Sequence, residues 1–338
     1  MTNSKKLSIL EGQVIGPESM VVDDEAIYVS VNDAKVLKIV DGKVRATAVY
    51  SKNPIFPPNM TRFEAEAICG RPLGIRKLVE GTKKFVLVDA YLGVFIIDFS
   101  DELRPKSTQI LDASKPIDGF RPNFLNDLDV ISEDELIITH SSIRHDCRHF
   151  FNLVLEHQGD GRILHLKIST GTVKVLAKNL YFPNGIQLTP DKKSAIFAEC
   201  SMARIKKLDL ETGKIDIFCE NLPGLPDNIR GTPRGTFWVG LAATRSKNYP
   251  SLLDRLGNWP GVRQFFVDIV PAAHWMKILV FSKHPHSIIV ELDSNGKIIR
   301  SLHDVTGKHV SDVSQVTEHN GFLYLGSFAD TYIAKVEL

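Results

Sequence analysis

The sequence predicts an all-β protein, a six-bladed β-propeller that spans residues 1–338 as a single domain. Three observations support this prediction. Short β-branched or aromatic segments, bounded by turn residues, fill most of the chain. A pattern of strand, tight turn and strand recurs along it. The segments that open each recurrence can be aligned in six places, which indicates a repeat architecture.

Composition and charge exclude several classes of partner. The chain is 43% hydrophobic and 24% charged, as is ordinary for a soluble globular protein. Its net charge of +1 creates no broad field toward nucleic acid or an anionic membrane, so we expect no nucleic-acid partner. The opening "MTNSKKLSILEGQVIG" contains no apolar signal core, and no run of about 18 apolar residues occurs anywhere.

Cysteine usage and one sequon bear on the compartment. Four cysteines are scattered without a CxxC pair, which favours neither a zinc ribbon nor a dense disulfide framework: Cys69, Cys147, Cys200 and Cys219. The sequon that begins at Asn59 permits glycosylation if the chain enters the secretory route. We expect the lumenal or extracellular side of the secretory pathway or cell surface if the natural protein carries an anchor, and the cytoplasm otherwise.

Six segments have the β-branched and aromatic content of strands: "AIYVSV", "KFVLVDA", "ELIITH", "SAIFAEC", "TFWVGL" and "FLYLGSF". Several lead on to a hairpin with a Gly-containing turn: "DAKVLKIVDGKVRATAVY", "GRILHLKISTGTVKVLAKNL" and "ARIKKLDLETGKIDIFCENL". Each of the six also follows an earlier alternating segment. The chain therefore reads as a series of units with about four strands each.

The opening segments of the units define the repeat: "GPESMVV", "RPLGIRK", "FLNDLDV", "FPNGIQL", "LPDNIRG" and "DVSQVTE". Their third places are Glu18, Leu73, Asn126, Asn184, Asp227 and Ser314, at spacings of 55, 53, 58, 43 and 87 residues. Six units of about four strands make a six-bladed propeller. The N-terminal "KLSILEG" is expected to supply the last strand of the sixth blade and so to close the ring.

The wide fifth spacing predicts an insertion near residues 245–285 of the fifth blade, with a helix or two. A doubly wound α/β fold is the competing interpretation. It would need helical patterns of about 10–15 residues between the strands, and these are absent outside the insertion. The apolar part of the insertion, residues 260–281, is interpreted as a lid, as a peripheral membrane contact, or as a segment packed on the propeller.

The third places carry the candidate site. The innermost strand of each blade runs along the central axis, so equivalent residues meet around it. Glu18, Asn126, Asn184 and Asp227 each carry a side-chain oxygen, and two of them are carboxylates. Such a set suits a hard cation such as Ca²⁺, whereas zinc would require His or Cys. The alternative is that each one is a turn or cap residue at a strand entry.

Two residues that follow these places also carry side-chain oxygens. Asn228 follows Asp227 and would add a fifth oxygen. Asp127 follows Asn126, but strict strand alternation points it away from the axis, and the same objection applies in part to Asn228. In "YFPNGIQLTPD", Gly185 and Pro190 are interpreted as turn residues, whereas the Asn184 oxygen is expected on a central calcium.

Long motifs across nearly the whole chain resemble the strictosidine-synthase-like propellers: "GPESMVV", "CGRPLGIR", "VDAYLGVF", "FLNDLDV", "GDGRILHL", "YFPNGIQLTPD", "AECSMARIKKL", "PGLPDNIR", "FWVG" and "EHNGFLYLGSF". More distant likenesses are to paraoxonases, gluconolactonases of the senescence marker protein type and diisopropyl fluorophosphatase. The resemblance implies a six-bladed propeller with calcium in its central tunnel. It places the calcium ligands on the same four third places, and in paraoxonases also on the position of Asn228.

Departures from these relatives limit the chemistry. Paraoxonases have a histidine where this chain has Leu73 in "PLGI", and their second histidine falls near Asp89. Plant strictosidine synthase has a glutamate where this chain has Ser314, so its amine–aldehyde condensation is not expected. Relatives often have "TDSS" where this chain has "THSS", which makes His140 an individual feature that we place near the tunnel.

The resulting expectation is a calcium-dependent hydrolase of esters or lactones, arylesterase-like and promiscuous. Asp227 is the candidate nucleophile or general base, with Glu18 as a weaker candidate, and a mobile His140 that titrates near pH 6.5 would assist proton transfer. No GxSxG elbow occurs, which disfavours a serine hydrolase. The alternative is a non-catalytic binding or scaffold propeller that keeps its calcium for stability.

The run "HDCRH" has a spacing that zinc can use. It places His145, Cys147 and His149 close together. We interpret it as a solvated loop between strands of the third blade.

Overall fold

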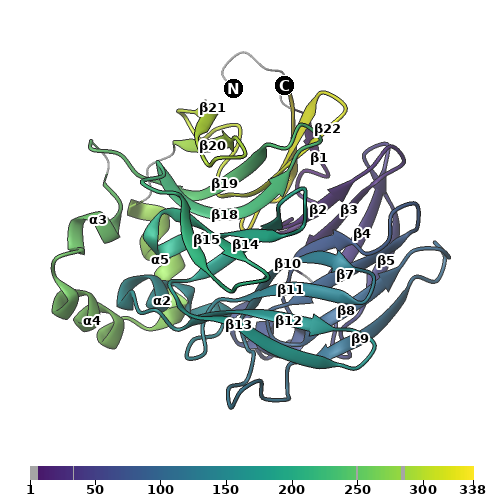
Figure 1. Cartoon of the computed structure of the whole chain (residues 1–338), viewed down its shortest axis with the longest axis horizontal. Coiled ribbons are helices and arrows are strands. Elements are labelled where there is room, and N and C mark those ends of the chain that lie inside the picture. Colours follow the sequence, from purple (N-terminus) through teal and green to yellow (C-terminus); the bar gives the residue numbers. More distant parts are fainter. Residues whose placement is uncertain (1–6, 33, 249, 283–285) are drawn as a thin grey trace.

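The chain folds into a ring of six four-stranded antiparallel sheets, in a computed structural model that describes residues 7–32, 34–248, 250–282 and 286–338 (Figure 1). Five sheets are contiguous in sequence, and the sixth combines the two ends of the chain. The inner strands contact one another in order around the ring. The predicted six-bladed propeller is therefore confirmed.

The strands of each blade follow one another from the axis outward. The inner strands are β2 (Met20–Val22), β6 (Pro72–Lys77), β10 (Leu125–Ser132), β14 (Pro183–Leu188), β18 (Gly224–Gly231) and β22 (Val313–His319). The second strands are β3 (Ile27–Val31), β7 (Lys84–Asp89), β11 (Glu135–His140), β15 (Ser194–Glu199), β19 (Phe237–Thr244) and β23 (Phe322–Ser327). The third strands are β4 (Lys35–Val40), β8 (Gly93–Asp98), β12 (Gly161–Lys167), β16 (Arg204–Asp209), β20 (Ser287–Leu292) and β24 (Ile333–Glu337). The outer strands are β5 (Lys43–Val49), β9 (Lys106–Asp112), β13 (Thr172–Leu180), β17 (Ile215–Cys219), β21 (Ile298–Asp304) and β1 (Leu7–Ile9).

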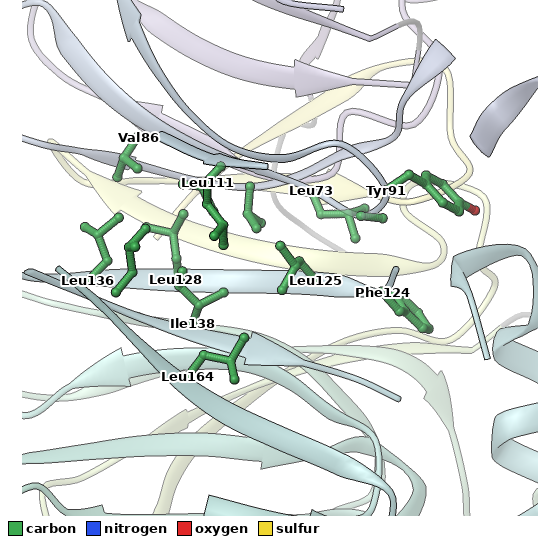
Figure 2. Close-up of a cluster of buried hydrophobic side chains, with 14 of the residues drawn as sticks. Leu73, Val86, Tyr91, Leu111, Phe124, Leu125, Leu128, Leu136, Ile138 and Leu164 are labelled. Atoms are coloured by element: carbon green, nitrogen blue, oxygen red, sulfur yellow. The ribbon is translucent and has the colours of Figure 1, made fainter. Parts of the chain in front are cut away.

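The six segments with the strongest strand signal all form second strands. These strands are covered on both faces by the neighbouring blades, and β15 is buried along its whole length. Continuous apolar runs are typical of strands buried on both faces. Most of the core therefore lies between blades. Figure 2 shows one such layer, where Leu73 and Val86 of the second blade face Leu128 and Ile138 of the third.

The ring is closed by the N-terminal strand. β1 pairs antiparallel with β24, with Leu7 opposite Lys335 and Ile9 opposite Ile333. The sixth blade therefore takes its outer strand from the start of the chain, as "KLSILEG" predicts. Unfolding this blade must separate the two ends of the chain.

Helices gather on one side of the ring, where α2, α3, α4 and α5 lie together (Figure 1). The helices and 3₁₀ turns are α1 (Arg62–Cys69), η1 (Cys147–His149), α2 (Phe150–Glu156), η2 (Cys200–Met202), α3 (Leu252–Leu256), α4 (Pro260–Ile269) and α5 (Ala272–Ser282). The last three lie between β19 and β20 of the fifth blade, and α2 packs against α4 and α5. Of the expected insertion, Tyr249 and residues 283–285 lie outside the described residues. None of the helices described is both long and apolar enough to cross a bilayer.

Local capping explains where α1 begins. Thr61 accepts from the backbone N–H of Glu64, and the Glu64 carboxylate accepts from the backbone N–H of Thr61. This reciprocal capping box satisfies two N-terminal donors of the helix. Thr61 is also the third residue of the sequon, and Asn59 is exposed. Glycosylation at Asn59 stays a prediction.

Candidate functional site in the central tunnel

β-bulges shape the N-terminal end of the inner strands. Pairing with the second strand shifts register between Leu125 and Leu128 in β10, between Pro183 and Ile186 in β14, and between Pro226 and Ile229 in β18. The same shift occurs in β6 and β22. A bulge breaks the regular alternation of side chains. The third and fourth places of these repeats therefore do not follow the strict alternation assumed from sequence.

All five predicted metal ligands are buried at this end of the inner strands. Their side chains are 6% exposed or less: Glu18, Asn126, Asn184, Asp227 and Asn228. The side chain of Asn184 donates a hydrogen bond to the Asp227 carboxylate, and the charges of Glu18 and Asp227 act on each other. The structure thus brings together residues from the first, fourth and fifth blades. Asn126 holds the equivalent place on β10, which contacts β14.

The donor set fits a hard cation. Among the described residues, the buried amide oxygens Asn184 Oδ1 and Asn228 Oδ1 have no hydrogen-bond partner, and the ion-pair partner of Glu18 Oε2 is the Arg71 guanidinium at 3.5 Å. Buried polar atoms are nearly always paired, so the two unpartnered amide oxygens beside two buried carboxylates fit a bound ligand. Ca²⁺ takes six to eight such oxygens. Across the described part of the chain no three His, Cys, Asp or Glu residues form a metal-binding group, and this set accordingly has only two carboxylates.

The two carboxylates are buried, and burial changes the pKa of both. Burial, followed by the charge of Glu18, raises the pKa of Asp227 well above its usual value. Burial also raises the pKa of Glu18, against the opposing effect of the nearby Arg71 guanidinium. Two like charges in a low-dielectric site favour a bound cation or a retained proton.

The stretch "YFPNGIQLTPD" is corrected by the structure at one residue. Gly185 is not in a turn; it lies within β14 beside Asn184. A Cβ added there would lie 2.4 Å from the carbonyl oxygen of Asp227 on the next blade. Glycine is required because the backbones of two inner strands approach closely. Pro190 does lie in a turn, after β14 ends.

Arg71 was not predicted from sequence. It precedes β6, is 8% exposed, and its Nη2 lies 3.5 Å from Glu18 Oε2. The same nitrogen donates to the carbonyl oxygen of Phe328 at 3.0 Å, which links the second blade to the connection between β23 and β24 of the sixth. Its Nε is buried without a partner among the described residues. A positive charge therefore stands beside the candidate cation site.

A second polar layer fills the interior next to these oxygens. Arg230 binds Asp127 through both terminal nitrogens, at 2.7 and 3.1 Å, and also donates to Ser19 Oγ at 2.9 Å. Arg76 donates to backbone carbonyls of the third, fourth and fifth blades. Asp127 also accepts from the backbone N–H of Ile186 at 3.0 Å. The expectation that Asp127 points away from the axis is therefore wrong, because the β10 bulge turns it toward the other inner strands.

A signal for this layer was present in the sequence. The pair Ile-Arg occupies the same place in "RPLGIRK" and "LPDNIRG", as residues 75–76 and 229–230. An arginine repeated at equivalent places of inner strands indicates a buried interaction around the axis.

His140 differs from the mobile imidazole expected from sequence. It is fully buried at the end of β11, and its Nδ1 accepts from Arg162 Nη2 at 3.0 Å and Nε at 3.2 Å. Burial and the charge of Arg162 lower the pKa of His140 to about 3, so the ring is neutral near pH 7. Arg162 itself donates to the carbonyl of Ile117. A role of His140 in catalysis stays a prediction, but a freely titrating ring is not what the structure shows.

Three positions that align with catalytic groups of the more distant relatives are occupied here by residues that pack in the core or form hydrogen bonds within the fold. Leu73 is buried in the core between the second and third blades. Ser314 Oγ donates to the backbone carbonyl of Glu18 at 2.6 Å, which ties the sixth blade to the first. Asp89 accepts from the Tyr50 hydroxyl at 2.6 Å.

The "HDCRH" run lies between β11 and β12 of the third blade, as expected, but it is half-buried and its last three residues form η1, which leads into α2, so it is not a solvated loop. His145 contacts Glu156 at 3.0 Å and His149 contacts Asp146 at 2.7 Å, so each ring has its own carboxylate. Burial raises the pKa of the Cys147 thiol well above its usual value. These three side chains do not form a zinc site in the described structure. All four cysteines are free thiols.

Comparison with known proteins gives the family. A sequence model described as strictosidine synthase matches residues 126–212. The chain is 37% identical over 334 residues to adipocyte plasma membrane-associated protein of Salmo salar, which covers 98% of this chain and 77% of the relative. The chain belongs to the strictosidine-synthase-like family that contains adipocyte plasma membrane-associated protein. The Homo sapiens member is 35% identical over 337 residues, with 98% and 77% covered, and strictosidine synthase-like 3 of Arabidopsis thaliana is 31% identical over 336, with 96% and 83% covered.

Solved structures share the fold of this strictosidine-synthase-like chain. A luciferin-regenerating enzyme aligns with a TM-score of 0.63 at 13% identity and covers 99% of this chain and 96% of its own. A gluconolactonase from Xanthomonas campestris aligns with a TM-score of 0.60 at 14% identity, with 99% and 90% covered. A calcium-binding regucalcin from Agrobacterium tumefaciens aligns with a TM-score of 0.58 at 13% identity, with 97% and 92% covered. At these identities the likeness concerns the fold alone.

Proposed function

We propose that this protein is a calcium-dependent hydrolase of esters or lactones, with arylesterase-like and lactonase-like activity. The observation that carries the proposal is the convergence of two buried carboxylates with unpartnered amide oxygens at the N-terminal end of the inner strands. Propellers of the same fold include proteins named as a gluconolactonase and as a calcium-binding regucalcin, which supports this chemical class.

The residues that would hold the ion are Glu18, Asn126, Asn184, Asp227 and Asn228. Calcium bound there would supply Lewis acidity toward a carbonyl oxygen and would lower the pKa of bound water. Asp227 is the group of this chain that would act as nucleophile or take up the proton. Asn184 orients that carboxylate by its hydrogen bond. Arg71, beside Glu18, adds positive charge where negative charge develops on an ester oxygen.

The test is hydrolysis of phenyl acetate and of a γ-lactone, with calcium and with chelator. Asp227→Ala and Glu18→Ala are expected to lose most of the calcium-dependent rate, because each removes a carboxylate from the site. His140→Gln serves as a third variant, and a retained rate there removes His140 from the mechanism. Equal rates for the parent and both carboxylate variants would overturn the proposal.

The alternative is a propeller that holds calcium for stability and does no chemistry. The observation that favours it is the lack of a mobile imidazole, since His140 is buried and held by Arg162. In that case chelator lowers the melting temperature, yet no substrate shows calcium-dependent turnover.

We also propose that the insertion makes a peripheral contact with membranes. Large apolar side chains of this segment are solvent-exposed among the described residues: Trp259, Val262, Phe265, Phe266, Ile269, Met276 and Ile278. An apolar cluster of this kind on a surface helix marks an interaction site. The relatives named as plasma membrane-associated are consistent with this contact.

Co-sedimentation with phosphatidylcholine–phosphatidylserine vesicles tests the contact. Phe265→Ser combined with Ile269→Ser should abolish sedimentation with vesicles. The matched control is Ile217→Ser, which alters a 47%-exposed isoleucine on the outer strand of the fourth blade. Equal binding by the double variant and the control contradicts the proposal.

A further inference from the structure

A cavity of about 200 Å³ lies between the helical insertion and the propeller, separate from the five candidate ligands. One wall is formed by Ser201–Ala203 of the η2 turn and by Leu225 of β18. The facing wall comes from α3 and α4, including Leu253 and Arg263, and His157 at the end of α2 completes it. Figure 1 shows α2, α3 and α4 together on this side of the ring.

Arg263 brings an uncompensated charge to this cavity. The residue is 7% exposed, its Nε is buried without a hydrogen-bond partner, and no carboxylate among the described residues forms an ion pair with its guanidinium. The second arginine of the wall, Arg245, is by contrast paired with Asp254 at 2.6 Å. A buried guanidinium without a carboxylate costs free energy of folding. The arrangement is explained if the charge meets a ligand.

Two further unpartnered atoms point to the same kind of ligand. Ser201 Oγ is buried, and among the described residues it has no hydrogen-bond partner; the same holds for His157 Nδ1. Burial, followed by the charge of Arg263, lowers the pKa of His157, so its ring is neutral near pH 7 and retains one N–H donor. The charge of Arg204 lowers the pKa of His157 further. The charge of Glu199 raises it, but the Glu199 carboxylate is itself bound by Arg204. A hydroxyl, an imidazole and a guanidinium from three elements can all serve one anion.

We propose that this cavity binds a small organic carboxylate. The carboxylate accepts from the Arg263 guanidinium and the Ser201 hydroxyl, a charge-assisted geometry for which arginine is suited. The rest of the ligand packs on the apolar wall formed by Met202, Leu225 and Leu253. Leu225 lies two residues before Asp227 on β18, so one wall of the cavity and the candidate cation site share a strand. Binding does not require that the protein be a hydrolase.

Calorimetric titration of the whole chain with benzoate tests the proposal, with benzamide as the uncharged isostere. Benzoate is expected to bind with one-to-one stoichiometry, and benzamide at least about 10-fold more weakly, since a charge-assisted contact is lost. Arg263→Met and Ser201→Ala should each weaken benzoate binding, the first by about 10-fold or more. The matched control is Arg255→Met, an exposed arginine of α3 outside the cavity lining, which should bind as the parent does.

Melting temperature separates a binding role from a structural one. Removal of an unpaired buried charge should leave the melting temperature of Arg263→Met equal to or above that of the parent. Benzoate should raise the melting temperature of the parent and not of this variant. Failure of Arg263→Met to fold, unchanged benzoate binding by it, or equal binding of benzamide and benzoate by the parent would each overturn the proposal. Phenyl acetate hydrolysis plays no part in these measurements, so the proposed function can fail while this site stands.

Discussion

Arg230 and Asp127 form a buried ion pair that connects distant parts of the interior. Asp127 is inaccessible to solvent and Arg230 is 5% exposed, and the pair joins the third blade to the fifth across the axis. Both charges were removed from water, so their attraction offsets a large desolvation cost. The pair is therefore more important for holding the blades in one arrangement than for net stability.

Breaking the pair by Arg230→Met should cost about 3–5 kcal/mol of the free energy of unfolding, because Asp127 stays buried with weaker compensation. Urea denaturation followed by circular dichroism measures this loss. Arg45→Met, on the exposed face of β5, is the control and should change stability by less than about 0.5 kcal/mol. A loss below about 1 kcal/mol for Arg230→Met would show that solvent or Arg76 already satisfies Asp127.

At the residue scale, the sequence predicts where the candidate ligands lie in the fold better than it predicts the residues around them. The oxygen-bearing third places are visible because repeat alignment reports equivalent positions directly. The direction of the Asp127 side chain is predicted wrongly because a β-bulge cannot be recognised in an alternating sequence pattern. Arg71 was missed because its approach to Glu18 depends on how the second blade meets the first and sixth, which no local pattern encodes.

At the scale of elements, the end of β7 illustrates how one buried carboxylate organises a turn. Asp89 accepts from the backbone N–H groups of Tyr91 and Leu92, both at 2.9 Å, and from the Tyr50 hydroxyl of the first blade. Burial raises the pKa of Asp89 to about 6, even though these three donors favour the carboxylate. Desolvation therefore exceeds the hydrogen bonding at this site.

The raised pKa predicts a pH dependence of stability with a definite sign. Between the unfolded pKa near 4 and about 6, the folded protein holds the Asp89 proton more tightly than the unfolded chain does. This contribution to stability is fully present below pH 4, is lost as pH rises to about 6, and amounts to on the order of 3 kcal/mol. Asp89→Asn, which keeps the acceptor for the turn, should flatten the stability profile over this interval. Urea midpoints at pH 4, 5 and 6 measure it, and an unchanged slope in the variant contradicts the assignment.

The strands can be predicted from sequence because the second strand of every blade is covered on both faces. Such a strand consists of a continuous run of apolar residues, many of them β-branched. The helices were predicted less well. The sequence predicts a helix or two in the insertion, whereas its described part has three, of which α3 is only five residues long. The "HDCRH" segment is predicted as a loop because three residues of 3₁₀ helix have no recognisable periodicity, whereas in the structure η1 leads into α2, which packs on α4.

At the scale of the whole molecule, stability depends on keeping six similar blades in one ring. β1 closes the ring at its outer edge, while Ser314 and Arg71 tie the last blade to the first two near the axis. A cation at the candidate site would add a link among the first, third, fourth and fifth blades, because its ligands come from all four. Calcium should therefore act on the unfolding of the whole propeller and not on a single loop.

The melting temperature in calcium and in chelator measures that link. At a calcium concentration about 100 times Kd, binding adds about 2.7 kcal/mol of stability, which corresponds to a rise of about 4 °C for 338 residues. Asn184→Ala should lose most of this rise because it removes one oxygen and the hydrogen bond to Asp227. Asn184→Asp, which keeps an oxygen at this place, should retain the rise in melting temperature, as should Leu73→Met in the second blade, which offers no ligand. An undiminished calcium effect in Asn184→Ala would return Asn184 to a purely structural role and would move any calcium site elsewhere in the molecule.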